Sequence, residues 1–335
     1  MAGQSPVTRV ALALGSGGAR GYAHIGVIDE LQSRGYEVVG IAGSSMGALV
    51  GGLHAAGSLD EFSDWAQTLT QRAVLRLLDP SITAAGVLRA EKILDAVRDI
   101  LGEATIESLP VPYTAVATDL IAGKSVWLQR GPIDAAIRAS IAIPGIIAPY
   151  VLDGRLLADG GILDPLPMAP ISAVKADVTI AVSLSGPAPD DDEVAAADPE
   201  TRASTEWLGR LLRSTSGLLD SNAARSILDT PAARSMLSRF GTGSDADSDD
   251  GPEDLEAPIP RLGSFAVMNR TIDIAQAALA RHQMAAYPPD LLIEVPRTAC
   301  RSLEFHRAAE VIDLGRELAA TALDGYRRTL TSEIP

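Results

Sequence analysis

The segment GSSMG, from Gly43 to Gly47, is the first stretch of this sequence whose residue types could do covalent chemistry. It has the form Gly-x-Ser-x-Gly, and it lies between an apolar run typical of a buried strand and residues typical of a helix. Glycines on either side allow a sharp turn that presents the hydroxyl of Ser45 to the positive end of the helix dipole. Alternatively, Ser44 or Ser45 only caps the helix. From these five residues alone, the role of a nucleophile and the role of a helix cap are equally well supported for the serine.

A serine hydroxyl needs a base to become a nucleophile, and the sequence contains only four histidines. His54 lies nine residues after Ser45 in the same predicted helix, too far along the axis to reach back. Packing or solvent exposure is the simpler role for His282 and His306, and His24, in the first predicted helix, either lines the site or packs. Asp159 instead follows an apolar run and precedes two glycines, where a half-apolar environment would raise its pKa and let it accept the proton directly. Taken alone, Asp159 is more simply explained as a turn residue.

The third candidate is a glycine-rich loop, GSGGARG at 15–21, between a predicted strand and a predicted helix. Such a loop exposes backbone N–H groups to an anion, so a phosphate or dinucleotide site competes with an oxyanion hole. The spacing lacks both the Gly-x-Gly-x-x-Gly pattern with its later acidic residue and the Gly-Lys-Ser/Thr ending of a phosphate loop. An oxyanion hole that serves Ser45 needs the same kind of donors from this position.

The elements that must position these residues alternate between strand and helix patterns, which predicts an α/β fold with a sheet covered on both faces. Strands are predicted at 9–14, 36–43, 113–120, 124–129, 177–185 and 291–295, with a hairpin turn at Asp153-Gly154. Helices are predicted at 19–33, 46–56, 59–72, 90–101, 263–284 and 304–328.

Residues 187–262 have a different composition from the rest of the chain. From 188 to 262 there are 16 Asp and Glu against 7 Arg, which gives −9 of the formal net charge of −15. The part at 241–260 is too polar to bury itself, while 202–238 is weakly helical in pattern. We therefore expect an acidic insertion or flap that is partly disordered.

Length and composition exclude several classes of protein. The 335 residues, 47% of them apolar, suffice for a large α/β domain, and a sequence pI near 4.7 argues against a nucleic-acid partner. The N-terminus resembles no signal peptide and no apolar run reaches the length of a membrane span. Cys300, the single cysteine, is expected to be a buried apolar residue. We infer a soluble, cytoplasmic protein whose contact with a membrane surface is at most peripheral.

The three motifs, in this order along the chain, resemble the patatin-like phospholipase family, especially its small bacterial members and the catalytic domain of neuropathy target esterase. The blocks that carry the resemblance are LALGSGGARGYAHIGVIDEL, GIAGSSMGALVGGLHAAG and IAIPGIIAPYVLDGRLLADGGILDPLP. The segments DLLIEVP and FHRAAEVIDLGRELA are similar to the C-terminal part of the bacterial members. The resemblance implies a three-layer α/β/α patatin-like fold with a mostly parallel central sheet. Its catalytic core would span 8–186, and 263–330 would complete the same domain.

The resemblance also implies roles for individual residues. Ser45 would be the nucleophile and Asp159 its base in a Ser-Asp dyad. The oxyanion hole would be formed by Gly17, Gly18 and Ala19. Supporting positions would be Gly15, Arg20, Gly21, Gly43, Met46, Gly47, Gly160 and Gly161. Neither a metal nor an organic cofactor is implied.

Two residues depart from the family pattern. Ser16 stands where members often have another glycine, which would alter the backbone angles of the loop. Asp164 stands where an asparagine is frequent, and its charge is expected to raise the pKa of Asp159.

Three functions follow as hypotheses. The first is hydrolysis of acyl esters of glycerolipids, as a phospholipase, lysophospholipase or esterase, through an acyl-serine intermediate at Ser45. The second keeps this intermediate but passes the acyl group to another acceptor or cleaves a thioester, as an acyltransferase or thioesterase. The third is a regulatory or scaffold protein that keeps the fold without catalysis, for which the acidic insertion is the support. The acyl-chain length, the head group and the oligomeric state stay open.

Overall fold

The computed structural model describes residues 7–77, 91–187 and 264–332, which all belong to one compact unit. The predicted insertion at 187–262 lies outside the described residues except for its first residue, as do the predicted disordered part at 241–260 and the weakly helical stretch at 202–238. These predictions therefore stay predictions.

An eight-stranded mixed sheet forms the centre of the unit, in the order β5-β6-β3-β2-β1-β7-β8, with β4 paired to β3. The five strands from β3 to β8 in this order are parallel, whereas β4, β5 and β6 pair antiparallel. The strands are β1 (Arg9–Leu14), β2 (Glu37–Ser44), β3 (Tyr113–Asp119), β4 (Lys124–Leu128), β5 (Tyr150–Leu152), β6 (Arg155–Asp159), β7 (Val178–Gly186) and β8 (Leu291–Pro296). The predicted mostly parallel sheet is confirmed.

Helices cover both faces of this sheet, as the alternation along β1 shows. Val10, Leu12 and Leu14 pack into the large core with α1 (Ala23–Ser33), α2 (Met46–Ala55), α3 (Leu59–Gln67) and α12 (Ala308–Ser332). Ala11 and Ala13 point to the other face, where α7 (Met168–Ile171) and α11 (Ser264–Ala286) pack. Since alternate residues of a strand face opposite sides, this pattern makes three layers. The α/β/α fold is confirmed.

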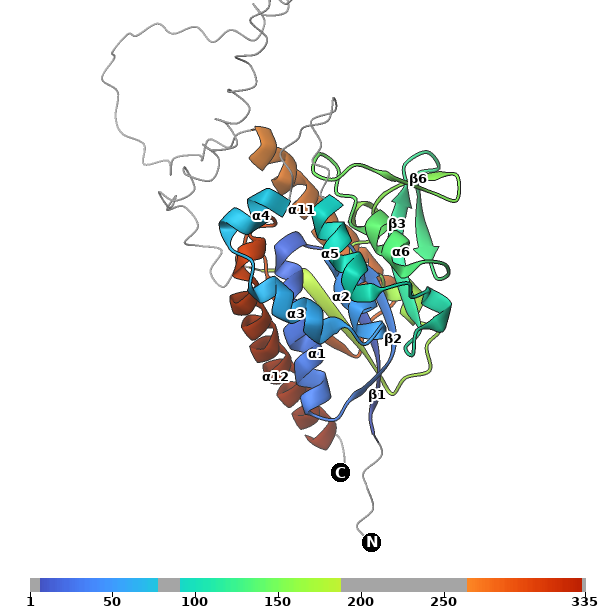
Figure 1. Ribbon diagram of the computed structural model, residues 1–335. Coiled ribbons are helices and arrows are strands. Elements are labelled where there is room, and N and C mark those ends of the chain that lie inside the picture. The colour runs from blue at the N-terminus through green and yellow to red at the C-terminus, as the bar shows by residue number, and fades with distance from the viewer. Residues whose placement is uncertain (1–6, 78–90, 188–263, 333–335) are drawn as a thin grey trace, which may run out of the picture. The chain divides into compact units, whose positions relative to one another are not determined.

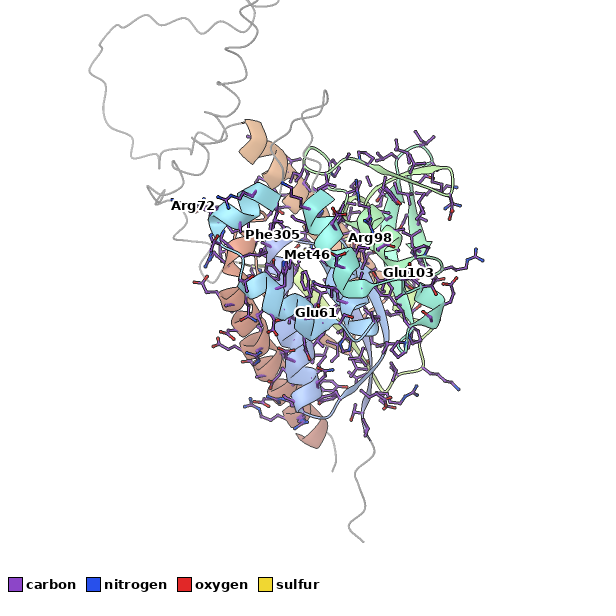
Figure 2. All side chains as sticks on the ribbon, viewed as in Figure 1. Met46, Glu61, Arg72, Arg98, Glu103 and Phe305 are labelled. Carbon is purple, nitrogen blue, oxygen red and sulfur yellow. The ribbon has the colours of Figure 1, made fainter. Side chains whose placement is uncertain are left out.

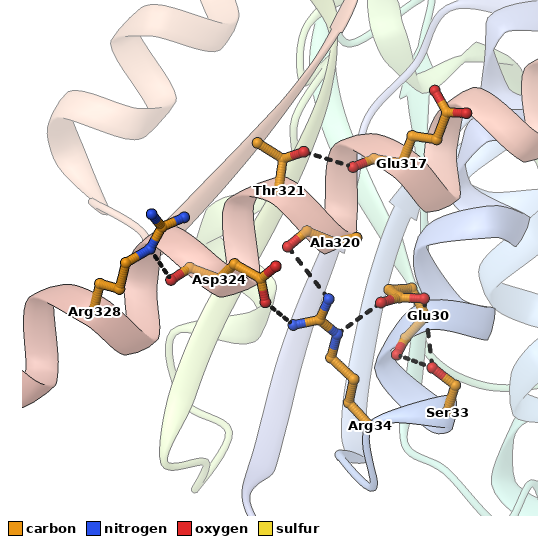
Figure 3. A network of polar contacts seen from close by, with 8 residues as sticks. All are labelled: Glu30, Ser33, Arg34, Glu317, Ala320, Thr321, Asp324 and Arg328. Atoms are coloured by element: carbon orange, nitrogen blue, oxygen red, sulfur yellow. Dashed lines mark hydrogen bonds and ion pairs between the residues drawn. The ribbon is translucent and has the colours of Figure 1, made fainter.

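Two glycines allow α12 to pack closely on α1, where Figure 1 shows the two helices running side by side. A Cβ atom on Gly26 would overlap the carbonyl of Ile312, and one on Gly315 would overlap the carbonyl of Ala23. Beyond this crossing, Arg34 links the helices, as Figure 3 shows. Its guanidinium donates to a Glu30 carboxylate oxygen of α1 at 2.6 Å, to the Ala320 carbonyl at 3.4 Å and to the Asp324 carboxylate of α12.

Most predicted elements are present, with small differences in their bounds. The predicted helix at 19–33 begins as a 3-10 turn over Gly18–Tyr22 before α1, and the one at 304–328 likewise begins as a 3-10 turn over Phe305–Arg307. The predicted helix at 59–72 is two helices, α3 and α4 (Gln71–Leu77), whereas α5 (Glu91–Leu101) agrees with the prediction. The hairpin turn is confirmed, since both Asp153 and Gly154 have positive φ.

Two helices were not predicted: the four-residue α7 and, closer to the candidate site, α6 (Ile133–Ser140). Its eight residues follow Pro132, the residue before the helix, and bury Ile133, Ala136 and Ile137 against the core. Such a short apolar segment does not show enough turns for a helical period to stand out in the sequence. The helix matters because its last residue, Ser140, reaches the candidate site.

Candidate active site

The strands that end at the candidate nucleophile and base meet end to end along one edge of β3. Both β2 and β6 pair with residues of β3 that also pair with β4, so they share the edge that β4 does not occupy. The last pair of β2 joins Ser44 to Val116, and the last pair of β6 joins Asp159 to Ala117. Ser45 and Asp159 are therefore brought together although 114 residues separate them.

Ser45 lies on a strained turn between β2 and α2. Its φ of 55° and ψ of −123° are uncommon for a residue with a side chain, a strain that costs on the order of 1–3 kcal/mol. The Ser45 Oγ donates a hydrogen bond to Asp159 Oδ2 at 2.5 Å. A Cβ atom on Gly43 would overlap the Gly47 backbone, and one on Gly47 would overlap the Leu14 carbonyl. The two glycines thus let strand, turn and helix pack closely enough to form this elbow.

Asp159 is buried and held by two hydrogen bonds. Besides the bond from Ser45, its Oδ1 accepts the N–H of Gly161 at 2.7 Å, which fixes the orientation of the carboxylate. Burial raises the pKa of Asp159 to about 6, while the hydrogen bonds from Ser45 and Gly161 act in the opposite direction. The carboxylate is ionised at neutral pH but has the proton affinity that a general base needs.

The sequence predicted that the half-apolar surroundings and the charge of Asp164 would both raise the pKa of Asp159; the first cause is confirmed and the second is wrong. Burial, and not the charge of Asp164, raises the pKa of Asp159. Asp164 is itself buried, which raises its own pKa to about 6, and its Oδ1 has no hydrogen-bond partner among the described residues. Gly160, between them in sequence, has no room for a side chain, because a Cβ atom there would overlap the Val116 carbonyl.

Ser140 is a residue of the site that sequence reasoning missed. Its Oγ accepts the backbone N–H of Ser45 at 3.0 Å and donates to the Val116 carbonyl at 2.6 Å. It therefore ties the strained turn to β3, the strand that brings Ser45 and Asp159 together. The signal in the sequence was weak, because a lone serine at the end of an unpredicted helix has no distinctive spacing.

The glycine-rich loop at 15–21 connects β1 to α1 beside this turn, since a Cβ atom on Gly21 would overlap the side chain of Met46. Figure 2 places Met46, the first residue of α2, in the middle of the view. Three N–H groups of the loop donate to carbonyl oxygens elsewhere in the fold: Gly15 to Val182, Ser16 to Pro165 and Ala19 to Ser302. The N–H groups of Gly17 and Gly18 have no hydrogen-bond acceptor among the described residues. Because the N–H of Ala19 already donates to the Ser302 carbonyl, Ala19 is no longer a candidate oxyanion donor. The N–H groups of Gly17 and Gly18 are the remaining candidates.

Arg20 holds the peptide group between these two glycines. Its Nε donates to the Gly17 carbonyl at 3.1 Å, and its Nη2 pairs with Asp273 of α11 at 3.0 Å. In a trans peptide the C=O and the following N–H point in opposite directions, so this bond directs the N–H of Gly18 away from Arg20. Gly18 also has a positive φ of 58°, which a glycine adopts without strain.

Ser16, which departs from the family pattern, contacts α11: its Oγ donates a hydrogen bond to Gln276 Oε1 at 3.2 Å. Gln276 lies one helical turn after Asp273 on α11, so both residues contact the glycine-rich loop from the same side of that helix. The loop is therefore fixed at two points by an element far away in the sequence.

No histidine takes the place of Asp159 as the partner of Ser45. His24 is completely buried, and its Nε2 lies 2.8 Å from the Gly15 carbonyl, which can only accept a hydrogen bond. Burial lowers the pKa of His24 to about 4, so its imidazole is neutral and supports the glycine-rich loop. Burial also lowers the pKa of His54, on α2, and His282 lies on α11.

The site is almost closed, since Ser45 is 3% and Asp159 4% exposed. Two surface cavities of about 470 and 350 Å³ lie elsewhere, the first beside Arg98 and the second beside Tyr113. In the part of the chain that the structure describes, no three His, Cys, Asp or Glu side chains gather as a metal site would require. Within the same ranges, no helix has the length and apolar character needed to cross a membrane.

Comparisons with known proteins show the family of the chain. Residues 12–171 match the family model described as patatin-like phospholipase. An uncharacterized NTE family protein of Mycobacterium tuberculosis is 67% identical over 336 residues, covering 95% of this chain and 92% of that protein. A second such protein of M. tuberculosis is 35% identical over 160 residues, covering 47% of this chain and 27% of its own. Neuropathy target esterase sws of Drosophila grimshawi is 32% identical over 165 residues, covering 47% of this chain and 11% of that protein. The buried Ser45–Asp159 pair thus lies within the matched region, and the chain belongs to the patatin-like phospholipase family, among its NTE proteins.

Proposed function

We propose that the protein is a serine acyl-ester hydrolase that acts on glycerolipids, as a phospholipase, lysophospholipase or esterase. Membership of the patatin-like and NTE families suggests a lipid hydrolase, and the name of the Drosophila relative is that of an esterase. The observation that carries the proposal is the 2.5 Å hydrogen bond from Ser45 Oγ to a buried carboxylate whose pKa is raised to about 6.

In the first half of the reaction, Asp159 Oδ2 takes the hydroxyl proton of Ser45 while Oγ attacks the carbonyl carbon of the ester. The carbonyl oxygen becomes an oxyanion, for which the N–H groups of Gly17 and Gly18 are the proposed donors. When this tetrahedral intermediate collapses, the bond to the alcohol breaks and Asp159 returns its proton to the leaving alkoxide. The acyl group stays on Ser45.

In the second half, a water molecule replaces the alcohol. Asp159 removes a proton from the water, whose oxygen attacks the acyl carbon, and the same two N–H groups stabilise the new oxyanion. Collapse breaks the bond to Ser45 Oγ, which takes its proton back from Asp159. The products are a free fatty acid and the resting enzyme.

Two other functions use or keep the same residues. An acyltransferase or thioesterase would form the same acyl-serine, because the oxyanion donors serve any acceptor or leaving group. A regulatory or scaffold protein would retain the fold without reacting. No contact among the described residues favours either function over ester hydrolysis, so they serve as outcomes of the experiment.

The experiment combines a fluorophosphonate probe with hydrolysis of short-chain and phospholipid esters. The unmodified protein is expected to be labelled and active, whereas Ser45→Ala and Asp159→Ala each lose at least about 1,000-fold in kcat/KM. Ser44→Ala is the matched control, since Ser44 is the last residue of β2, directly before Ser45, and its Oγ has no hydrogen-bond partner among the described residues.

The outcomes separate the three functions. Labelling with free fatty acid as the product supports the hydrolase, while acyl transfer to an added alcohol that outpaces hydrolysis supports the acyltransferase. Full activity of either Ser45→Ala or Asp159→Ala would contradict the proposed Ser45–Asp159 dyad. Absence of labelling in the unmodified protein would leave the scaffold function.

A further inference from the structure

The turn between β3 and β4 exposes two apolar side chains in an ordered backbone. Ile121 is 82% exposed and Leu120 is 43% exposed. The turn is held by Asp119, whose Oδ1 accepts the N–H groups of both Ile121 and Ala122 at 2.9 Å. Most isoleucines in a protein of this size are buried. Here a well-formed turn presents one to solvent.

This turn lies past the strand ends at which the candidate active site is formed. β2 and β3 are parallel and Ser44 pairs with Val116, so β3 continues past the level of Ser45 toward Ile121. Strand β3 continues three residues beyond Val116 to Asp119, which at about 3.3 Å per strand residue is roughly 10 Å, and the turn with Ile121 follows. Figure 1 shows this end of β3 beside β6, the strand that ends at Asp159.

The hairpin of β5 and β6 extends the apolar surface. The N–H of Leu120 donates to the Leu156 carbonyl at 2.9 Å, and Leu156 pairs with Val151 of β5. Val151 is 65% exposed. Two neighbouring connections of the sheet thus expose large apolar side chains at the same end.

Basic residues accompany this surface in a protein that is otherwise acidic. Lys124 begins β4 and Arg155 begins β6, both are exposed, and among the described residues neither forms an ion pair. The one exposed acidic residue at these two turns is Asp153. The exposed charges at the two turns are therefore two cations and one anion, above the buried Asp119, whereas the whole chain has a formal charge of −15.

We propose that the docking surface formed by Leu120, Ile121, Lys124, Val151 and Arg155 binds the surface of an anionic lipid bilayer or aggregate. Apolar side chains would enter the interface while the two cations contact anionic head groups. A second copy of the chain is the weaker alternative, because a stable dimer buries about 1,600 Å² and two turn tips offer only a few side chains. The proposal rests on the proposed function, since it explains how a lipid substrate is met at the edge where Ser45 lies.

The experiment measures binding of the full chain to vesicles by co-sedimentation, with phosphatidylcholine alone and with phosphatidylglycerol added. Binding is expected to be stronger with phosphatidylglycerol and to weaken as salt is raised. Ile121→Asp is expected to lower the partition coefficient at least about tenfold, as placing a charge at an interface costs that much or more. The double variant Lys124→Glu and Arg155→Glu is expected to remove the preference for phosphatidylglycerol.

Val7→Asp is the matched control. Val7 is 57% exposed but precedes β1, at the opposite end of the parallel strands, so its substitution is expected to leave vesicle binding unchanged. Thermal unfolding midpoints of all variants show whether each is folded. Equal binding of Ile121→Asp and the unmodified protein, both folded, would overturn the proposal, as would a loss of self-association in Ile121→Asp without loss of vesicle binding.

The two assays distinguish a wrong docking surface from a wrong proposed function. Hydrolysis of a water-soluble ester by the unmodified protein tests the catalytic residues without any vesicle. If that hydrolysis occurs but vesicles are not bound, the docking surface is wrong and the hydrolase stands. If vesicles are bound through Ile121 but no ester is cleaved, the docking surface stands and the hydrolase is wrong.

Discussion

At the scale of single residues, the burial of Asp159 sets the pH range in which it would serve as the proposed base. Burial raises its pKa to about 6, so the carboxylate is a stronger base than an exposed aspartate yet is still ionised at neutral pH. The same burial makes the ionised form costly for the folded state, although bonds from Ser45 and Gly161 offset part of that cost. We expect kcat/KM for a soluble ester to rise with pH up to about 6 and then level off.

The first prediction concerns the stability of Asp159→Asn. The pKa of Asp159 is higher in the folded state than in the unfolded state, so its stability contribution falls as pH rises from about 4 through about 6. The asparagine lacks this titration. Urea unfolding should therefore show that the free energy of unfolding of Asp159→Asn, relative to that of the unmodified protein, increases by roughly 1 kcal/mol from pH 5.5 to pH 8. An unchanged difference at the two pH values would mean that the aspartate is not desolvated as the structure indicates.

The second prediction concerns Ser140→Ala. The change leaves the buried Ser45 N–H without its acceptor and the Val116 carbonyl without its donor, which should destabilise the fold by about 1–3 kcal/mol. Because the strained turn loses its anchor, kcat should fall about 10- to 100-fold with little change in KM. Steady-state kinetics and urea unfolding measure both effects. Ser172→Ala is the control, since Ser172 is exposed and bonds only to the Ala169 carbonyl; an equal loss of kcat there would contradict the assignment.

At the scale of elements, the candidate site depends on two contacts made between distant segments. Strand β3 aligns the ends of β2 and β6, which places Ser45 against Asp159. Helix α11 contacts the glycine-rich loop through Asp273 and Gln276. The proposed dyad and the proposed oxyanion donors are thus held by different elements.

The third prediction tests the contact from α11. Arg20→Lys keeps a positive charge but cannot bond the Gly17 carbonyl and Asp273 together, so the Gly17–Gly18 peptide should lose its orientation. We expect kcat to fall about tenfold, with a smaller fall in Asp273→Asn and little change in KM. Arg34→Lys is the control, because Arg34 links α1 to α12 away from the loop (Figure 3). If Arg20→Lys and Arg34→Lys have the same kcat, Arg20 has no positioning role.

The fourth prediction compares two glycines of α12. Gly315→Ala should destabilise the protein by about 1–3 kcal/mol, since the new methyl group would overlap the Ala23 carbonyl of α1. A Cβ atom on Gly325 meets no atom within 4 Å, so Gly325→Ala should stabilise the helix by up to about 1 kcal/mol. Urea unfolding of both variants measures the difference, and similar values for the two would contradict the close packing of α1 on α12.

At the scale of the whole molecule, the described parts of the chain on either side of 188–263 form one compact unit. β8 and α12 come from the C-terminal part, yet β8 completes the sheet beside β7 and α12 packs on α1. This arrangement supports the proposal that 8–186 and 263–330 are one catalytic domain interrupted by an acidic insertion at 187–262.

The fifth prediction tests this organisation by limited proteolysis of the full chain. Cleavage is expected first between 188 and 262, and the two flanking fragments should stay associated because β7 pairs with β8 and α1 packs on α12. Mass spectrometry locates the cut sites, and gel filtration shows whether the fragments separate. Early cleavage within 8–186, or separation of the fragments under native conditions, would contradict a single interrupted domain.

The sequence alone determined what depends on local chemistry and periodicity. Apolar runs gave the strands, paired glycines marked the elbow at Ser45 and the loop at 15–21, and the lack of a suitable histidine directed attention to Asp159. The helix α6 escaped prediction because it is short, and Ser140 escaped with it.

Only the tertiary structure decided which atoms meet. Spacing along the chain contains no information on the edge that β2 and β6 share, on the amides of the loop that are already bonded, or on the two contacts from α11. The half-apolar surroundings of Asp159 in the sequence predicted a raised pKa, but only the structure shows that the charge of Asp164 is not among its causes, because burial depends on every element packed around the carboxylate. Long-range packing, which no local pattern encodes, therefore turns a serine and an aspartate 114 residues apart into a hydrogen-bonded pair.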